Sequence, residues 1–383
     1  MKNLAIKVLH IGADNIGYGG RSVIAYNLAR YMDYGKIKND FLAFSCVDMH
    51  YEKAIIKNGG KVLQIKLPKY TNKIRYEYIR SKLIVTNLKE QNYDIVHIHA
   101  DNAYEAVKSV FIVKDAGINN IVIHAHNTGS SIEFSVLKKL IIKICKYIIK
   151  KSNYLQLACS NEAKEYMFGK GNDKKTYIIK DGIETKKFKY NQYTRKKIRE
   201  EFGYNDGNMI LGCVGRLSHQ KNHIFLLNVF KKVLELSPEA KLLLVGDGEL
   251  KNELLQTCND LNISDSVVFL GNRNDVSDLL QAMDVFVLPS LYEGFGIVNL
   301  EAQCTGLPCV LSDNIPKFVK VTEAVTFLSL NCTLDIWVKE IFYHYRRNIS
   351  NRKDCCNNVI SCGFDIEQSS KKVESLYSSY FMK

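Results

Sequence analysis

Short apolar runs alternate with helical patterns along the chain, and this alternation limits the folds that the chain can adopt. Buried strands separated by helical segments are typical of parallel sheets that helices cover on both faces. The sequence therefore predicts an α/β fold with parallel sheets. Strands are expected near 5–11, 41–46, 95–99, 121–126 and 155–160 in the first half, and near 210–215, 242–246, 267–271, 285–289, 308–312 and 325–330 in the second.

The length of the chain favours two domains, because 383 residues exceed what one ordinary core holds. A polar segment between about 186 and 208, rich in Lys, Asn, Tyr and Arg, separates two complete α/β patterns. We therefore expect one domain at 1–186 and a second at 187–364. The last segment, 365–383, contains the pattern of a terminal helix.

Composition places the chain among globular proteins, with 46% hydrophobic and 24% charged residues. No uncharged apolar run reaches eighteen residues, so no spanning helix is expected. The apolar N-terminus is interrupted by Lys7 and is interpreted as a first strand rather than a targeting segment. Eleven cysteines without CxxC pairs or zinc spacing favour a reducing cytoplasm.

The net charge of +13 lies entirely in the first half of the chain. Residues 1–186 contain 30 Lys and Arg against 17 Asp and Glu, whereas the remainder contains 23 of each. A basic half suggests an anionic partner such as a membrane surface, a lipid diphosphate or a nucleic acid. No nucleic-acid-binding motif accompanies the scattered charge, so the nucleic acid is disfavoured. A generic Lys-rich surface is the simpler alternative.

Two glutamates, Glu293 and Glu301, mark a candidate site between a buried strand and a helix-compatible run. A strand end, a glycine-containing turn and a helix start form ligand sites at the carboxyl edge of parallel sheets. The helix N-terminus would favour an anion such as a diphosphate. Glu293 is then placed to meet sugar hydroxyls, and Glu301 to accept hydrogen bonds from a ribose. The alternative is an exposed loop with two solvated carboxylates.

Three more strand ends of the second half carry residues suited to a nucleotide. Arg216 and Lys221 follow one strand and can hold a diphosphate, with Arg able to bind it in a fork. Gly246 permits close backbone approach after the next strand, and Arg273 follows a third. Parallel strands bring these ends and the two glutamates to one edge of one sheet. For Arg216 and Lys221, the alternative is that both are isolated cations on the surface.

The first half offers a glycine loop at a helix start, formed by Gly17, Gly19 and Gly20. Such loops commonly bind phosphate, although this one lacks the acidic residue of the full dinucleotide fingerprint. His124 and His126 alternate at a strand end, with His126 nearer the edge. For His124 a structural role is favoured.

His97 and His99 also alternate near a strand end. For both histidines, packing in the core is the preferred interpretation. His99 and Asp101 are also close enough to the strand end to reach a ligand site there.

Residues 134–151 form an amphipathic pattern. Apolar residues share one stripe and lysines the opposite one: Leu137, Ile141, Ile144 and Ile148 against Lys139, Lys143, Lys146 and Lys150. We expect the apolar stripe to pack on the sheet and the lysines to contact anionic lipid headgroups. An ordinary surface helix whose lysines face water is the alternative.

The acidic motif, the Arg216–Lys221 loop and their order along the chain resemble the retaining glycosyltransferases of family 4. The resemblance continues through 301–316 and is similar to the capsular and exopolysaccharide subgroup, from which Lys317 and Phe318 depart. It implies a GT-B fold, in which two Rossmann-like domains face each other across a cleft. The first domain would bind the acceptor and the second the nucleotide-sugar donor, and the C-terminal helix would pack back on the first.

The resemblance also implies roles for individual residues. The expected catalytic residues are Glu293, His126, Arg216 and Lys221. The expected donor-binding residues are Arg216, Lys221, Gly246, Arg273, Glu293, Gly294, Phe295, Gly296, Ile297, Val298 and Glu301. Gly17, Gly19 and Gly20 would line the phosphate and acceptor side.

These residues predict a metal-independent glycosyl transfer. No Asp-x-Asp metal motif is present, so the two cations and a helix N-terminus would stabilise the leaving diphosphate. The expected reaction moves a hexose or N-acetylhexosamine from a nucleotide sugar, most simply a UDP-sugar, to a lipid-linked saccharide in capsule, exopolysaccharide or O-antigen synthesis. The expected location is the inner face of the plasma membrane. Alternatives are a nucleotide-sugar epimerase of the same fold and an inactive sugar-nucleotide-binding subunit.

Overall fold

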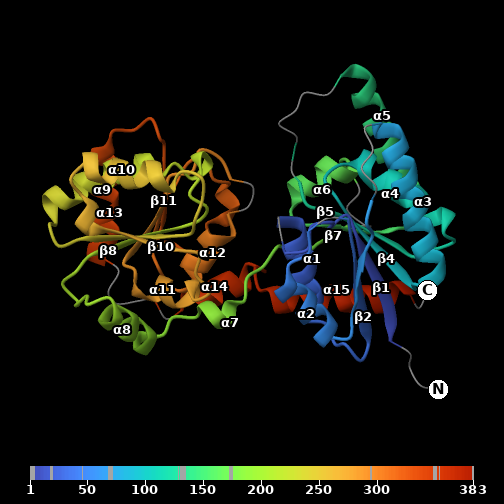
Figure 1. Cartoon of the computed structure of the whole chain (residues 1–383), viewed down its shortest axis with the longest axis horizontal. Coiled ribbons are helices and arrows are strands. Elements are labelled where there is room, and N and C mark those ends of the chain that lie inside the picture. The colour runs from blue at the N-terminus through green and yellow to red at the C-terminus, as the bar shows by residue number, and fades with distance from the viewer. Residues whose placement is uncertain are drawn as a thin grey trace. The chain divides into compact units, whose positions relative to one another are not determined.

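The computed structural model describes residues 5–17, 20–44, 46–67, 72–127, 129, 135–171, 176–293, 296–347, 352 and 354–381. The chain divides into two compact units (Figure 1). The first comprises Met1–Asp181 with Ile366–Lys383, and the second comprises Gly182–Asp365. The boundary therefore falls a few residues before the predicted one.

The first unit is built on a seven-stranded parallel sheet of order β3-β2-β1-β4-β5-β6-β7. Its strands are β1 (Ile6–Ile11), β2 (Ile37–Ala43), β3 (Val62–Gln64), β4 (Ile95–Ala100), β5 (Ile121–Ala125), β6 (Leu155–Ala158) and β7 (Thr176–Ile178). The five predicted strands are present. The two outermost strands were not predicted, because three residues are too few to make a recognisable apolar run.

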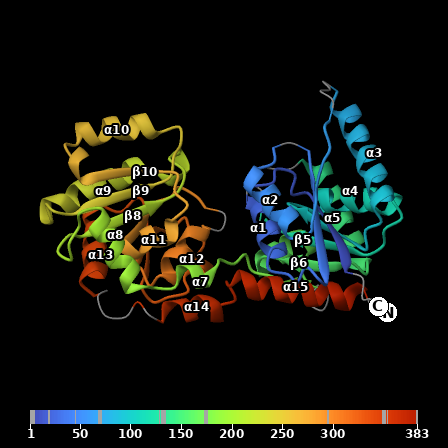
Figure 2. The ribbon, with the colours of Figure 1, turned by 60° about the horizontal axis from the view of Figure 1, so that its bottom comes forward.

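Helices cover both faces of this sheet. They are α1 (Gly20–Ala29), α2 (Met49–Lys57), α3 (Lys73–Gln91), α4 (Ala103–Asp115), α5 (Val136–Lys151), α6 (Asn161–Phe168) and α15 (Ile366–Phe381). Helices α3 to α6 bury side chains against one face. Helix α15 lies across the strands on the other (Figure 2), where Val373 and Tyr377 are buried with Val8 and with Leu28 of α1. The C-terminal helix is thus part of the first unit.

The second unit contains a six-stranded parallel sheet of order β10-β9-β8-β11-β12-β13. Its strands are β8 (Ile210–Val214), β9 (Lys241–Val245), β10 (Val267–Gly271), β11 (Val285–Leu288), β12 (Cys309–Ser312) and β13 (Val325–Leu328). All six coincide with predicted strands to within two residues. Two parallel sheets therefore confirm the predicted α/β class.

The helices of the second unit pack around one hydrophobic core that includes Phe230, Phe286 and Trp337. They are α7 (Thr185–Phe188), α8 (Gln192–Glu201), α9 (His223–Leu236), α10 (Lys251–Asp260), α11 (Val276–Ala282), α12 (Ile297–Cys304), α13 (Leu334–Arg347) and α14 (Cys355–Ser361). In the described part of this unit, the short 3₁₀ turns are η1 (His219–Lys221), η2 (Ser264–Ser266) and η3 (Lys317–Val319).

An arginine network closes the C-terminus of α11. Arg195, Arg199 and Arg352 donate to the backbone carbonyls of residues 280–283 that the helix end leaves unpaired. Arg195 and Arg199 also bond opposite oxygens of Asp284, at 2.5 and 3.2 Å. These cations therefore neutralise a carboxylate and carbonyl dipoles, and they support the fold rather than an anion site.

Both sheets reverse their strand order at the centre, between β1 and β4 in the first unit and between β8 and β11 in the second. In open α/β sheets, ligands bind beyond the carboxyl ends of the strands at such a reversal. We therefore expect a ligand site in each unit among the residues that follow these four strands.

Candidate functional site

Lys221 and Glu293 meet at the strand reversal of the second unit. Lys221 ends the η1 turn after β8, and Glu293 follows β11. The Lys221 Nζ lies 2.5 Å from Glu293 Oε1, and their side chains are 14% and 7% exposed. Ser290 Oγ donates to the same carboxylate oxygen at 2.8 Å. The second oxygen, Oε2, has no hydrogen-bond partner among the described residues, so it is available to accept a bond from a hydroxyl group.

Hydrogen bonds to backbone carbonyls fix the two loops that carry this ion pair. The Leu291 N–H donates to the Gln220 carbonyl at 2.8 Å, and Gln220 Nε2 donates to the Tyr292 carbonyl at 3.0 Å. Ser312 Oγ, at the end of β12, donates to the Ser290 carbonyl at 2.5 Å. The ammonium and the carboxylate are consequently held in place before any ligand binds, as a preorganised site requires.

Helix α12 begins beside this pair. Gly296 precedes it with a φ of +65°, and a Cβ there would lie 2.6 Å from Asn299 Nδ2, so the turn requires glycine. Ile297 and Val298 form the first turn and pack on the core. Asn299 is buried, and neither polar atom of its side chain has a hydrogen-bond partner among the residues that the structure describes. The predicted contacts of Gly294 and Phe295 lie outside the described residues.

Glu301 lies on the second turn of α12 and is partly buried. Burial raises the pKa of its carboxyl group to about 7, with Lys187 acting to lower it and Glu184 to raise it. The carboxyl group has no hydrogen-bond donor among the described residues. A ligand that supplies hydroxyl donors would compensate this desolvation. The contact of Glu301 with a ribose stays a prediction.

The ends of β8, β9 and β10 line a pocket of about 480 Å³. Its lining residues are Val214, Gly215, Arg216, Val245, Gly246, Asp247, Asn272, Arg273 and Val276. Gly246 is required here, because a Cβ on it would lie 2.1 Å from the Gly215 carbonyl oxygen. Three predicted donor residues, Arg216, Gly246 and Arg273, are therefore brought together in this one pocket.

Each cation of the site has an acidic neighbour. Arg216 pairs with Glu249 at 3.1 Å in an exposed contact, and Arg273 bonds both oxygens of Asp275 at 2.7 and 2.5 Å. Lys221 instead pairs with Glu293. The sequence predicted Arg216 and Lys221 as one cationic pair, but the structure gives each a separate carboxylate. An incoming diphosphate would have to share or displace these contacts.

In the first unit, histidines gather on the sheet face that α1 and α15 cover. His10, His97, His99 and His124 are buried, and the strand register aligns His10 with His97 and His99 with His124. The predicted packing role of His97, His99 and His124 agrees with this burial. His126 follows β5 and is half-buried, as its position nearer the edge predicted. Burial, with a smaller effect of Arg21, lowers the pKa of His126 to about 3.

The glycine loop ends next to a charged pair that sequence reasoning missed. Gly17 has a φ of +85° and Gly20 begins α1, whereas Gly19 lies outside the described residues. Arg21 then forms an ion pair with Asp101, which follows β4, at 3.3 Å. Burial raises the pKa of Asp101, and Arg21 opposes that rise. The signal in the sequence was an arginine directly after two glycines at a helix start.

Helix α5 is oriented differently from the prediction. Cys145 and Ile149 face the core, with Ile142 and Ile148 partly buried. Most of the predicted core stripe is exposed, including Leu137 at 69% and Ile144 at 52%. The helix is apolar over a wider arc than one stripe, and only the part toward α4 and α6 contacts the core. The prediction that the whole stripe packs on the sheet was therefore wrong.

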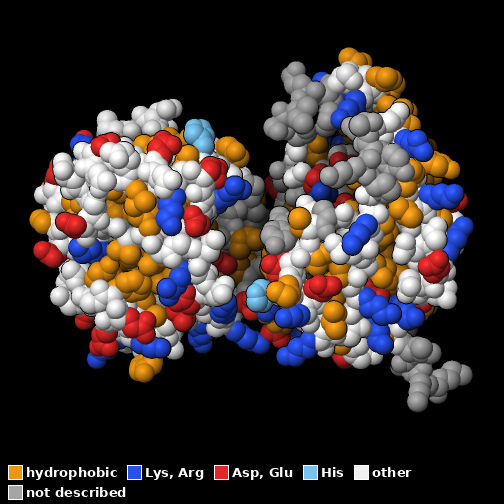
Figure 3. Space-filling model, viewed as in Figure 1, with side chains coloured by type: hydrophobic (Ala, Val, Ile, Leu, Met, Phe, Trp, Pro, Cys, Tyr) orange, Lys and Arg blue, Asp and Glu red, His pale blue; other side chains and the backbone are white. Residues whose placement is uncertain are grey.

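The outer side of α5 consequently combines apolar and basic groups. Figure 3 shows hydrophobic side chains beside Lys and Arg at the outer end of this helix. Lys139 and Lys143 are exposed there. Lys146 lies over the Tyr166 ring, and Lys150 reaches the Lys170 carbonyl at 3.5 Å. Among the described residues, no helix is both long enough and apolar enough to cross a bilayer.

Two Rossmann-like units, each with polar residues at its strand reversal, define a two-domain doubly wound α/β protein. Residues 194–325 match the family model of glycosyl transferases group 1. The chain is 31% identical over 301 residues, 76% of both chains, to the UDP-Gal:alpha-D-GlcNAc-diphosphoundecaprenol alpha-1,3-galactosyltransferase of Escherichia coli. The chain therefore belongs to the group 1 glycosyl transferases. It is also 28% identical to EpsF of Bacillus subtilis (strain 168), over 97% of this chain and 96% of that one.

Solved structures agree on the fold. The crystal structure of Anabaena Alr3699/HepE, in complex with UDP and glucose, has a TM-score of 0.73 at 20% identity and covers 98% of this chain and 100% of its own. WaaG, a glycosyltransferase of lipopolysaccharide biosynthesis, has a TM-score of 0.69 at 16% identity and covers 97% of this chain and 99% of its own. The predicted GT-B class of fold is confirmed.

Proposed function

We propose that this glycosyltransferase moves a hexose or N-acetylhexosamine from a UDP-sugar to a lipid-linked saccharide, with retention and without a metal ion. The Lys221–Glu293 pair at the strand reversal, together with the desolvated carboxyl group of Glu301 on α12, is the observation that carries the proposal. The name of the E. coli relative supports a UDP-sugar donor and a diphosphate-linked lipid acceptor. Capsule, exopolysaccharide or O-antigen synthesis is the pathway class in which such a product is used.

Each residue then has a chemical role. Lys221 and Arg216 neutralise the charge that grows on the leaving diphosphate, with the start of α12 directing N–H groups to it. Glu293 Oε2 accepts a hydrogen bond from a donor-sugar hydroxyl. Arg273 lies beside the base, and the loop of Gly17, Gly19 and Gly20 beside phosphate or acceptor. This cationic set supplies the charge that a metal ion would otherwise provide, so no metal is required.

Glu301 and His126 complete the proposed set. Glu301 accepts hydrogen bonds from the ribose hydroxyls, and His126 contacts the sugar or the acceptor. The relatives described above are glycosyltransferases, which favours transfer over epimerisation. An inactive binding subunit is distinguished by UDP binding without turnover.

Protonation of Glu301 provides a test of the donor site. Ribose hydroxyls favour the charged carboxylate, so nucleotide binding should lower its raised pKa and release a proton. At pH 6.5, titration calorimetry in buffers of different ionisation enthalpy should show roughly three-quarters of a proton released from Glu301 with UDP, if binding returns its pKa to the ordinary range. Glu301→Gln should bind UDP more weakly and release none.

The calorimetric experiment includes GDP and ADP as alternative nucleotides. Chelator is present throughout, so that binding is measured without divalent metal. Equal proton release and equal UDP affinity in wild type and Glu301→Gln would contradict the ribose contact. Absence of binding by every nucleotide would contradict the donor site as a whole.

We also propose that α5 lies on an anionic membrane. Leu137, Leu140 and Ile144 are exposed beside Lys139 and Lys143, which is the arrangement of an interfacial helix. Its apolar residues would enter the headgroup boundary while the lysines contact phosphate groups. This location would bring the protein to a lipid-linked acceptor.

Vesicle binding tests the proposed membrane contact. Each lysine near an anionic surface contributes about 1 kcal/mol, so Lys139→Gln/Lys143→Gln should weaken binding to phosphatidylglycerol-containing vesicles by roughly 30-fold. The control variant Lys196→Gln/Lys197→Gln removes the same charge from α8 and should bind like wild type. Sedimentation with vesicles of graded anionic content measures both. Equal losses in the two variants would indicate only a net-charge effect.

A further inference from the structure

Three histidines and an asparagine form a continuous hydrogen-bonded chain inside the first unit. His126 Nε2 lies 2.9 Å from His99 Nδ1, and His99 Nε2 lies 3.0 Å from His10 Nδ1. His10 Nε2 then lies 3.0 Å from Asn39 Oδ1. The chain runs from the carboxyl end of β5 through β4 and β1 to β2. The metal-free chemistry proposed above uses only its first member, His126.

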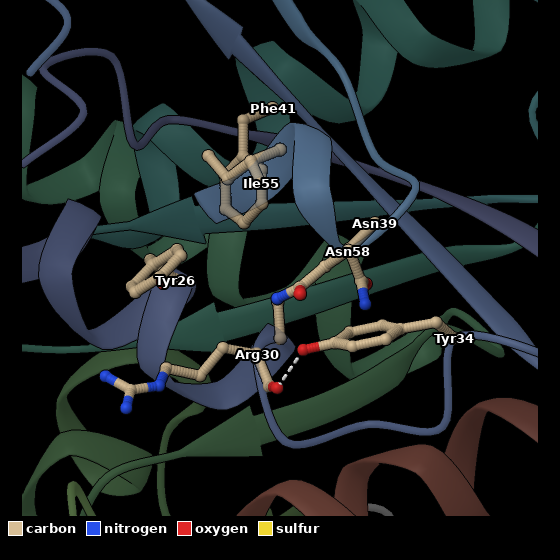
Figure 4. A pocket seen from close by; sticks show the side chains of 8 residues that line it. Tyr26, Arg30, Tyr34, Asn39, Phe41, Ile55 and Asn58 are labelled. Atoms are coloured by element: carbon tan, nitrogen blue, oxygen red, sulfur yellow. Dashed lines mark hydrogen bonds between the residues drawn. The ribbon is translucent and has the colours of Figure 1, made fainter. Parts of the chain in front are cut away.

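The far end of this chain has a fixed polarity. Asn39 Oδ1 can only accept a hydrogen bond, whereas Asn39 Nδ2 lies 3.5 Å from Met32 Sδ, a weak acceptor. The amide orientation therefore presents oxygen to His10. Figure 4 shows Asn39 and Phe41 among the residues that line a small pocket of about 10 Å³, with Tyr34 donating to the Arg30 carbonyl.

This polarity determines the tautomer of every ring in turn. His10 must carry its proton on Nε2 to donate to Asn39, which leaves His10 Nδ1 as an acceptor. His99 must then donate from Nε2 and accept at Nδ1, and His126 must donate from Nε2. Burial lowers the pKa of all three imidazoles, so each is neutral and has one proton to place.

Packing holds the rings in these positions. His10 stacks on Phe41 with centroids 4.6 Å apart and an interplanar angle of 11°. His99 stacks on His97 at 4.2 Å and 15°, and His97 Nδ1 lies 2.5 Å from the Tyr377 hydroxyl of α15. A half-turn flip of the His10 or His99 ring would break two hydrogen bonds, and a flip of His126 would break its bond to His99, so the order of donors is locked from the core outward.

One atom remains at the outer end. His126 Nδ1 is shielded from solvent and has no hydrogen-bond partner among the described residues, so it is a buried acceptor left for a ligand group, and it is unprotonated in the tautomer that the chain dictates. We propose that Asn39, His10 and His99 are positioning residues that fix His126 Nδ1 as a hydrogen-bond acceptor for a hydroxyl of the sugar donor or the saccharide acceptor. This inference rests on the proposed transferase function.

Binding of a metal ion is the alternative role for these imidazole side chains. Nitrogens of His10, His97 and His99, and of His99, His124 and His126, lie within 4.8 Å of one another. His99, however, belongs to both groups and uses its two nitrogens toward opposite neighbours. The near-parallel stacking of His97 and His99 also does not aim both rings at one centre. The hydrogen-bonded chain accounts for this geometry, and metal binding becomes an outcome of the test.

Nuclear magnetic resonance of the ring nitrogens measures the tautomers directly, and the measurement does not depend on the protein's transferase activity. In wild type labelled with ¹⁵N-histidine, long-range proton–nitrogen correlations should show Nε2–H and bare Nδ1 for His10, His99 and His126. Each is assigned by the signal lost in its own variant. An Nδ1–H tautomer or an imidazolium at His126 would overturn the proposal. Stoichiometric Zn²⁺ binding that shifts these signals would assign the rings to a metal instead.

Two variants of one residue test the consequence for turnover. His99→Leu removes the acceptor of His126 and should lower kcat for transfer about tenfold, with a smaller change in the KM for the donor. His99→Asn can present an oxygen near the Nδ1 position and should recover most of the lost kcat. Unchanged kcat in His99→Leu would overturn the positioning role.

The controls separate this inference from the proposed function. UDP affinity should stay unchanged in both variants, because neither substitution removes a proposed diphosphate or ribose contact. Thermal unfolding reports whether the variants fold. A wild type that binds UDP but transfers no sugar would overturn the transferase function and the substrate contact of His126, whereas the tautomers would still be read from the spectra.

Discussion

Lys221→Met should lower the kcat of sugar transfer by about 100- to 1,000-fold, which is the usual loss when one preorganised group facing developing charge is removed. Methionine keeps the apolar length of the side chain and removes the ammonium. The leaving diphosphate then loses a cation that the structure holds at the strand reversal. Initial rates of UDP release with saturating acceptor measure the effect.

The partner of Lys221 requires a second variant. Removing the ammonium leaves Glu293 as a nearly buried, unpaired carboxylate, and this can destabilise the fold by roughly 3–5 kcal/mol. Lys221→Met/Glu293→Gln removes both charges and should regain most of the stability but not the activity. Recovery of activity in the double variant would mean that Lys221 serves only to neutralise Glu293.

Asp284→Ala should reduce the free energy of unfolding by roughly 3–5 kcal/mol, because it leaves buried arginines without their carboxylate. Asp284 accepts from Arg195 and Arg199, and also from the Ile210 N–H at 2.8 Å where β8 begins. Arg199 is only 2% exposed, so its charge cannot be solvated in place. Urea denaturation monitored by circular dichroism measures the change.

An exposed ion pair provides the matched control for that measurement. Asp335→Ala removes the carboxylate that Lys232 contacts at 2.6 Å, where the Asp335 side chain is 74% exposed. Surface pairs contribute little to stability, so this variant should unfold close to wild type. A similar loss in both variants would contradict a special role for the arginine network.

Strands and strand-end loops were predictable because their signals are local. The apolar runs of β8 to β13 and the polar residues after them are contiguous in the sequence, and parallel pairing then brings them to one edge. The placement of Lys221 and Glu301 beyond the strand ends could be predicted for this reason. Strands β3 and β7 could not, since three residues at a sheet edge leave no periodic pattern.

The pairings between distant residues were not predictable. Several strands and helices lie between Lys221 and Glu293 in the sequence. The residues around either one do not indicate that the Lys221 ammonium forms an ion pair with the Glu293 carboxylate. The chain from Asn39 to His126 depends on the register of four strands. The orientation of α5 was predicted wrongly, because the periodicity of the sequence shows which residues are apolar but not which part of a wide apolar surface packs on the core.

Transfer of sugar to a lipid-linked acceptor tests the central claim most directly. Purified protein is incubated with each of several UDP-sugars and a polyprenyl-diphosphate-linked N-acetylglucosamine, with chelator present, and the product is analysed by mass spectrometry and by the anomeric coupling in its proton spectrum. One UDP-sugar should yield a glycosylated lipid with the anomeric configuration of the donor, together with UDP. Free epimer without acceptor, or no product from any UDP-sugar by a protein that binds UDP, would contradict it.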